Sequence, residues 1–365
     1  MKKYKVVVYA ICKNEESFVD RWVSSMKEAD DIYVLDTGST DKSVEKLKKS
    51  GVKVSAKIIS PWRFDVARNE SLALVPNDVD ICVCTDLDEV FKPGWRNILE
   101  KIWTDKTTRI AYDYNWSLDE NDIPLVNFYI EKIHSRNDYK WTHPVHEILT
   151  YIGKDTENKI FTDEITLNHY PDNNKSRGSY LPLLELSVKE SPDDDRNVHY
   201  LGREYMYYGK WNDSIDTLIK HLSLPSATWK DERCASMRFI SRCYQALNRL
   251  DEARMWLDKA MNEAPHLRDP FAERAILEYK QKNWDKVEFY SKKALEIKYH
   301  PKTYINEPFS TNSSLYDLMS LALFYQGKFK SSLSFVEKCL ELSPNDERLI
   351  RNKKIINEAL EKANS

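Results

Sequence analysis

The fold is decided by the stretch from Val79 to Glu89, which reads VDICVCTDLDE. Its first seven residues are mostly apolar or β-branched, and they predict a buried strand. Two carboxylates, Asp86 and Asp88, follow directly at the carboxyl end of that strand. Ligands of open α/β sheets bind beyond the carboxyl ends of the strands, and alternate carboxylates there can hold a divalent cation that also contacts phosphate oxygens. A strand that simply ends in an acidic turn is the alternative.

Three more strands are predicted before this stretch. Apolar, largely β-branched runs lie at residues 6–10, 32–35 and 52–59. Apolar side chains at helical spacing follow the first run, at residues 18–26. Strands that alternate with helices in this way predict an α/β domain with a mostly parallel sheet.

Four short segments stand out in the first part of the chain: Ile11–Glu16, Val34–Asp41, Phe64–Asn69 and Asp86–Glu89. Taken together and in this order, they resemble the family 2 glycosyltransferases of the GT-A fold. The resemblance covers about residues 4–180 and implies a Rossmann-like, mostly parallel sheet with helices on both faces. One departure is that many relatives carry two acidic residues before the Gly-Ser-Thr-Asp turn, whereas Thr37 follows Asp36 here.

The resemblance implies a set of contacts to a nucleotide-sugar donor. Asn14 and Glu15 are expected to line the nucleotide site, and Asp36 is expected to accept a hydrogen bond from the base. Arg68 is expected at the diphosphate, for which a planar, permanently charged guanidinium is well suited. Two alternatives remain: Asp36 only caps its turn, or Arg68 only pairs with a surface carboxylate.

A second set of residues is implied around the ribose and the metal ion. Asp86 is expected at the ribose, and Asp88 is expected to be a ligand of Mn²⁺ or Mg²⁺. His169, just past the sheet in a segment that also resembles the family, is expected to ligate the same ion through an imidazole nitrogen, which suits manganese better than magnesium. Lys175 and Arg177 follow it and are expected to contact the nucleotide sugar. An ordinary hydrogen-bonded histidine is the alternative for His169.

The segment Lys140–Glu147 ends in Val-His-Glu, as in bacterial members that resemble lipopolysaccharide-core glucosyltransferases and peptide S-glycosyltransferases. Sugar transfer develops oxocarbenium-like charge, and an inverting enzyme needs a group that takes the acceptor proton as the new bond forms. Glu147 is the expected base and His146 the second choice, with an ordinary hydrogen-bonded role as the alternative for His146. The histidines expected to be structural are His134, His143 and His199.

From about Asp194 onward the sequence becomes helical, and a similar turn recurs four times. Leu250 and Trp284, which close the middle two turns, are 34 residues apart, the tetratricopeptide period. The region resembles a degenerate tetratricopeptide array, whose helix pairs bury their apolar faces by stacking. The turns are residues 208–211, 247–250, 281–284 and 326–329.

These patterns predict a GT-A nucleotide-sugar-binding domain at residues 1–190 and an all-α tetratricopeptide-like domain at residues 195–365. The tryptophans of the helical region are expected mainly in its core. Two uses of its surface remain open. One is a groove that recruits a protein, peptide or glycan acceptor, and the other is an interface that forms a homodimer.

Composition narrows the class of protein. The net charge of −3 over 365 residues does not favour a nucleic-acid partner, which requires a basic footprint. No apolar stretch reaches the ~18 residues of a membrane span, so we expect a cytoplasmic protein without a transmembrane segment. The six cysteines lack the spacing of a zinc or C-x-x-C site and are expected to be buried, reduced thiols.

The sequence thus predicts a metal-dependent inverting hexosyltransferase that uses a nucleoside diphosphate sugar, UDP-linked, as donor. Two other classes remain. A nucleotidyltransferase would share the early sheet and the paired carboxylates but release pyrophosphate. A non-catalytic repeat scaffold with a vestigial nucleotide-binding domain would bind no nucleotide sugar.

Overall fold

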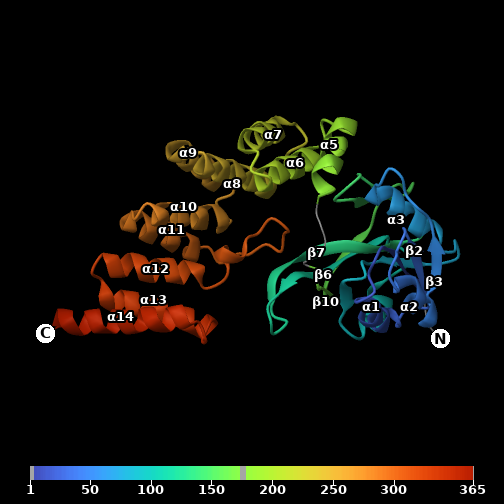
Figure 1. The fold of residues 1–365 in the computed structure, drawn as a ribbon, viewed down its shortest axis with the longest axis horizontal. Coiled ribbons are helices and arrows are strands. Elements are labelled where there is room, and N and C mark those ends of the chain that lie inside the picture. Colours follow the sequence, from blue (N-terminus) through green and yellow to red (C-terminus); the bar gives the residue numbers. More distant parts are fainter. Residues whose placement is uncertain (1–3, 173–177, 365) are drawn as a thin grey trace. The chain divides into compact units, whose positions relative to one another are not determined.

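The computed structural model describes residues 4–172 and 178–364. It divides into two compact units, Met1–Lys189 with Lys302–Tyr304, and Glu190–Pro301 with Ile305–Ser365. The first unit contains the strands and the second contains helices (Figure 1). The predicted fold class is confirmed: a curled, mostly parallel GT-A-like sheet with helices precedes an all-helical region.

The strands form one large sheet and one hairpin. The strands are β1 (Val6–Cys12), β2 (Asp31–Asp36), β3 (Lys53–Ala56), β4 (Ile81–Cys84), β5 (Glu89–Phe91), β6 (Arg109–Leu118), β7 (Pro124–Ser135), β8 (Tyr139–Thr142), β9 (Ile148–Tyr151) and β10 (Lys159–His169). The eight-stranded sheet has the order β3-β2-β1-β4-β7-β6-β10-β5, and β8 pairs with β9. Pairing is parallel from β3 to β4 and between β6 and β10, whereas β7 and β5 run antiparallel to their neighbours.

Helices cover both faces of this sheet. The first unit has α1 (Val19–Met26), α2 (Ser43–Lys49), α3 (Phe64–Ala73), α4 (Trp95–Ile102) and, at its end, α5 (Tyr180–Glu190). Alternate side chains of β1 enter two separate cores, because successive residues of a strand point to opposite faces. Val6 and Val8 pack with side chains of α1, α2 and α4. Val7 and Tyr9 pack with α3 and the β8–β9 hairpin.

The predicted strands are found, but two are shorter than their apolar runs. The run at 52–59 gives only β3, Lys53–Ala56, and the run at 79–85 gives β4, Ile81–Cys84. β4 is buried throughout, as expected for a strand covered on both faces. It ends two residues before Asp86, so the acidic segment is a turn at the carboxyl edge of the sheet.

The helical unit consists of antiparallel helix pairs. Its helices are α6 (Asp195–Tyr207), α7 (Trp211–Ser223), α8 (Lys230–Ala246), α9 (Leu250–Glu263), α10 (Asp269–Lys280), α11 (Trp284–Glu296), the short 3₁₀ helix η1 (Pro308–Ser310), α12 (Ser314–Tyr325), α13 (Phe329–Leu342) and α14 (Glu347–Asn364). All four predicted turns separate two helices of a pair. Each contains one left-handed residue, namely Gly209, Asn248, Lys282 or Gly327, as in a helix C-terminus closed by a Schellman motif.

The tryptophans of the helical unit are not all in its core. Trp256 is buried, and Trp211 and Trp284 are half-buried. Trp229 precedes α8 and is 39% exposed, so for this residue the prediction of a core position is wrong.

All six cysteines are buried and free, as predicted. No helix in the described parts of the chain is long and apolar enough to cross a membrane.

Candidate active site

The nucleotide side of the predicted site is a pair of interlocked turns that follow β1 and β2. The Asn14 Oδ1 atom accepts a hydrogen bond from the Thr40 backbone N–H at 2.7 Å, and the Asn14 N–H donates to Ser39 Oγ at 2.9 Å. The Glu15 N–H donates to Ser43 Oγ at 2.7 Å. Asn14 has a φ of 56°, a left-handed conformation that asparagine tolerates better than most residues.

Asp36 caps its own turn. Its carboxylate accepts hydrogen bonds from the backbone N–H groups of Gly38 at 3.1 Å and Ser39 at 3.2 Å, and the residue is 5% exposed. Gly38 has a φ of 111°, a backbone conformation that residues with a Cβ rarely adopt, so glycine is favoured at this position. The capping alternative for Asp36 is therefore present in the structure, and its contact to a base remains a prediction.

Helix α3 positions the β8–β9 hairpin, which carries the expected base. The Asn69 side chain forms two hydrogen bonds with the backbone of Trp141, one to its carbonyl at 2.8 Å and one from its N–H at 2.9 Å. The Phe64 N–H donates to the Pro144 carbonyl at 2.9 Å. Through these contacts, the Phe64–Asn69 motif holds the loop that carries the Val-His-Glu motif.

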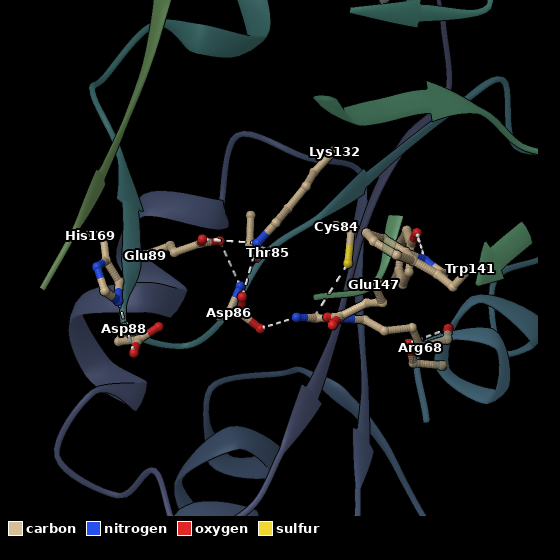
Figure 2. A network of polar contacts seen from close by, with 12 residues as sticks. Arg68, Cys84, Thr85, Asp86, Asp88, Glu89, Lys132, Trp141, Glu147 and His169 are labelled. Carbon is tan, nitrogen blue, oxygen red and sulfur yellow. Dashed lines mark hydrogen bonds and ion pairs between the residues drawn. The ribbon is translucent and has the colours of Figure 1, made fainter. Parts of the chain in front are cut away.

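Arg68 connects the two carboxylates of the centre (Figure 2). Its Nη2 donates to Asp86 Oδ1 at 2.6 Å and its Nε to Glu147 Oε1 at 3.0 Å, while Nη1 points to Cys84 Sγ at 3.6 Å. The residue is 4% exposed and stacks over Trp141. Arg68 is therefore buried, while the side chain of its partner Asp86 is 34% exposed. The contact of Arg68 to a diphosphate remains a prediction.

Lys132 is a central residue that the sequence analysis missed. Its Nζ lies 2.9 Å from both Asp86 Oδ2 and Glu89 Oε1. Burial lowers the pKa of Lys132, but Asp86 and Glu89 raise it by more, so the ammonium stays charged. Tyr114 OH also donates to Glu89 Oε1, at 2.8 Å. No local pattern marks Lys132, because it reaches the site through the pairing of β7 with β4.

The same network sets the charge of the carboxylates. Burial alone would raise the pKa of Asp86, but Arg68 and Lys132 lower it to well below its ordinary range, so Asp86 is ionised. Glu89 behaves differently: burial raises its pKa, and the neighbouring Asp86 and Asp88 raise it further against the opposing effect of Lys132.

The expected metal ligands lie at the other end of the network, to the left in Figure 2. Asp88 Oδ2 and His169 Nε2 are 3.4 Å apart. His169 Nδ1 is 2.9 Å from the Trp116 carbonyl, which accepts a hydrogen bond, so Nδ1 carries a proton. Nε2 faces Asp88: it donates to that carboxylate when the ring is cationic and presents a lone pair on the same side when the ring is neutral. Burial lowers the pKa of His169, but the bond to Asp88 and its charge raise it by more. The indole of Trp116 stacks on His169, with ring centroids 4.5 Å apart.

These two residues fit a divalent cation. An oxygen and a nitrogen lone pair converge, and a backbone carbonyl fixes the histidine tautomer, as second-shell partners of metal-bound histidines commonly do. Arg68 and Lys132 contact three carboxylates, and Asp88 lies close enough to raise the pKa of Glu89, so carboxylates outnumber these cationic side chains. The cations are Arg68 and Lys132, and the carboxylates are Asp86, Asp88, Glu89 and Glu147.

The loop with the expected base has an unusual backbone. Both His143 and His146 have positive φ values, of 74° and 52°, which is uncommon outside glycine and often found at functional sites. The His146 ring stacks on Tyr180, with centroids 5.7 Å apart. Glu147 instead turns toward Arg68. The structure therefore joins Glu147 to Arg68 and, through it, to Asp86.

Of the other sequence expectations, His134 is structural: Tyr9 OH lies 2.8 Å from its Nε2, and the Ser135 carbonyl lies 2.7 Å from its Nδ1. Lys175 and Arg177 lie outside the described residues. The residues that the sequence analysis missed are Lys132, Glu89, Tyr114, Trp116 and Trp141.

Comparison with known proteins agrees with this architecture. Residues 7–151 match the family Glycosyl transferase family 2, and residues 313–346 match a tetratricopeptide repeat. No curated protein matches the chain.

Similar solved structures are helical repeat proteins. One is a thermophilic tetratricopeptide repeat protein of Thermus thermophilus, with 20% identity, coverage of 50% of this chain and 90% of that one, and a TM-score of 0.35. Another, from Parabacteroides merdae, has 15% identity, coverage of 51% and 67%, and a TM-score of 0.39. The C-terminal part of a repeat protein from Cytophaga hutchinsonii has 13% identity, coverage of 51% and 67%, and a TM-score of 0.42.

The chain therefore combines a family 2 glycosyltransferase domain with a tetratricopeptide repeat in its C-terminal region. The first implies a nucleotide-sugar donor and an acceptor, and the second suggests interaction with protein.

Proposed function

We propose that this protein is a metal-dependent, inverting glycosyltransferase that transfers a sugar from a UDP-linked donor to a protein, peptide or glycan acceptor. The observation that carries the proposal is the carboxylate network. Arg68 joins Asp86 to Glu147, and Asp88 forms a neighbouring pair with His169. Residues 7–151, which match family 2 glycosyltransferases, include Arg68, Asp86, Asp88 and Glu147.

Asp88 and His169 would hold the cation, Mn²⁺ or Mg²⁺. A bound divalent cation would neutralise the departing diphosphate. The charge balance supports this assignment, because a diphosphate would add further negative charge to a centre that already has more carboxylates than cations. Asn14, Glu15 and Asp36, on the turns after β1 and β2, would line the nucleotide, and Asp86 would lie at the ribose.

Glu147 would take the proton of the acceptor as the new glycosidic bond forms. Its Oε1 accepts a hydrogen bond from Arg68 Nε. Because the same guanidinium also bonds to Asp86, it would orient the Glu147 carboxylate relative to Asp86. Because Arg68 contacts both carboxylates, it would also transmit the binding of the donor to the position of the base. Inversion rests on the family resemblance and on a single base at the acceptor side.

The test is product analysis with the full chain. We incubate the protein with a panel of UDP-sugars and Mn²⁺, and identify the released nucleotide by chromatography and mass spectrometry. Sugar transfer, or donor hydrolysis without an acceptor, releases UDP. Release of pyrophosphate would identify a nucleotidyltransferase instead, and no metal-dependent turnover of any nucleotide sugar would contradict the proposal.

A further inference from the structure

A second group of potential metal ligands lies in the helical unit. His199 on α6, His221 on α7 and Glu232 on α8 are all buried, with at most 4% exposed. One ring nitrogen from each histidine and one carboxylate oxygen lie within 4.8 Å of one another. Among residues 4–172 and 178–364, these three form the one group of at least three His, Cys, Asp or Glu side chains whose ligand atoms lie this close together.

A single hydroxyl lies between the two imidazoles. Ser236 Oγ lies 2.7 Å from His199 Nδ1 and 2.9 Å from His221 Nδ1. A hydroxyl oxygen has two lone pairs, so Ser236 can accept a hydrogen bond from the Nδ1–H of both rings. That arrangement leaves the Nε2 atom of each ring with its lone pair, the tautomer that a metal-binding histidine needs.

The two Nε2 atoms are buried without a hydrogen-bond partner among the described residues. A buried polar atom without a partner is unfavourable, and buried groups of this kind are nearly always satisfied by protein, water or an ion.

One pair of the ligand atoms has the spacing found at a tetrahedral ion. His221 Nε2 and Glu232 Oε1 are 3.4 Å apart. Two ligands that each lie ~2.0–2.1 Å from tetrahedral zinc are separated by about 3.4 Å. A direct but long hydrogen bond from His221 to Glu232 is the competing explanation, and it leaves the Nε2 of His199 without a partner.

We propose that His199, His221 and Glu232 bind a divalent transition-metal ion, with Zn²⁺ the preferred one, and that Ser236 orients both imidazoles. Two nitrogens and one carboxylate oxygen form a typical zinc donor set with one position left for water. Because each ligand comes from a different helix, the ion would fasten α6, α7 and α8 and stabilise the start of the helical unit. The proposal is independent of the active-site cation.

The test uses the full chain with the substitution Asp88→Asn, so that the proposed active-site cation does not contribute. The protein is stripped with a chelator, dialysed against Zn²⁺ and then against buffer, and its zinc is measured by mass spectrometry. We expect one equivalent of zinc, a rise in the thermal midpoint with Zn²⁺ but not with Mg²⁺, and the visible absorption of tetrahedral Co²⁺ when cobalt replaces zinc. A stripped protein that takes up no zinc would overturn the proposal.

Matched variants assign the ligands. His199→Asn keeps an amide near the position of Nδ1, which can still bond to Ser236, but it removes Nε2; Glu232→Gln keeps the shape of the side chain and removes its charge. Both are expected to lose the zinc equivalent and the cobalt absorption, whereas His300→Asn, at an exposed histidine, retains them. Retention of full zinc by His199→Asn and Glu232→Gln would overturn the proposal. Circular dichroism checks that each variant folds. If a ligand variant does not fold, the cobalt titration of the chain that carries only Asp88→Asn decides whether the metal site exists.

Discussion

At the scale of single residues, Arg68 explains why this cluster of carboxylates can exist in a mostly buried place. Its guanidinium is 4% exposed and contacts carboxylates from two separate segments, Asp86 and Glu147. Carboxylates this close together repel one another unless a cation lies between them. Arg68 presents donors in a fixed planar fork, so it holds the two carboxylates in fixed positions as well as balancing their charge.

Glu147→Gln tests the role of the base. The amide oxygen of glutamine can still accept the bond from Arg68 Nε, but the side chain can no longer take a proton. We expect turnover to fall by ~10²–10⁴, the usual effect of losing a general base, with donor affinity nearly unchanged. Steady-state kinetics with His146→Ala as the comparison checks this; an inactive His146→Ala beside a fully active Glu147→Gln would reverse the two roles.

His134 gives a prediction about pH. Burial lowers its pKa to about 3, whereas an unfolded chain has a histidine pKa near ~6.5. Between these values the unfolded state binds one proton more than the folded state, so this contribution to stability is complete above pH 6.5 and is lost as pH falls. The free energy of unfolding is expected to fall by about 1.4 kcal/mol for each pH unit below ~6.5.

We therefore compare urea unfolding at pH 7 and pH 5 for the parent and His134→Asn. The variant has a lower stability at both pH values, because Tyr9 OH loses its acceptor, but the difference between pH 7 and pH 5 should shrink by about 2 kcal/mol. An unchanged difference would show that His134 does not titrate in this way.

At the scale of elements, strand β7 completes the site, because it carries Lys132 to the carboxylates at the end of β4. Lys132→Met should lower the free energy of unfolding by about 3 kcal/mol, since it removes the cation beside the buried Glu89, whereas Asp86 keeps Arg68. The double variant Lys132→Met with Glu89→Gln should recover part of this loss. Chemical denaturation measures both.

The matched control is Lys159→Met on β10. Lys159 also bonds to a carboxylate, Glu131 at 2.7 Å, but it is 30% exposed, so its loss should cost no more than about 1 kcal/mol. Equal effects of the Lys132 and Lys159 substitutions would show that the buried network does not stabilise the domain.

The sequence predicted those turns whose conformation depends on residues only a few positions apart. The repeat turns were predicted to within one residue, because a left-handed residue such as Gly209 or Asn248 and the helix ends on either side are encoded within a few positions. The Asp86–Glu89 turn followed from the apolar run before it. Lys132 could not be predicted, because its place depends on the register between β4 and β7, in which Cys82 pairs with His134. The buried contacts of Arg68 depend on long-range packing in the same way.

At the scale of the whole molecule, the chain joins a transferase domain to a helical domain with a distinct core. Aromatic side chains such as Trp229 and Tyr207, at 39% and 58% exposed, give the helical unit apolar surface with polar edges, which suits contacts with protein. We expect this unit to recruit a protein or peptide acceptor, with formation of a homodimer as the alternative use.

Truncation after Glu190 distinguishes these two uses. The fragment should retain metal-dependent donor hydrolysis, while transfer to the true acceptor falls sharply relative to the full chain. Circular dichroism verifies that the fragment is folded, and light scattering compares the mass of both proteins. Equal transfer rates would exclude recruitment by the helical unit, and a monomeric fragment from a dimeric parent would assign assembly to it.

The central claim is that Asp88 and His169 hold a divalent cation that binds the nucleotide sugar. Calorimetric titration of UDP-sugars into the full chain, with Mn²⁺ or with a chelator, tests it most directly when repeated with Asp88→Asn. The account predicts that Mn²⁺ strengthens donor binding to the parent at least tenfold, or about 1.4 kcal/mol, and that Asp88→Asn removes this gain while the circular dichroism spectrum stays the same. Equal donor affinity with manganese and with chelator, or a full manganese effect in the variant, would contradict it.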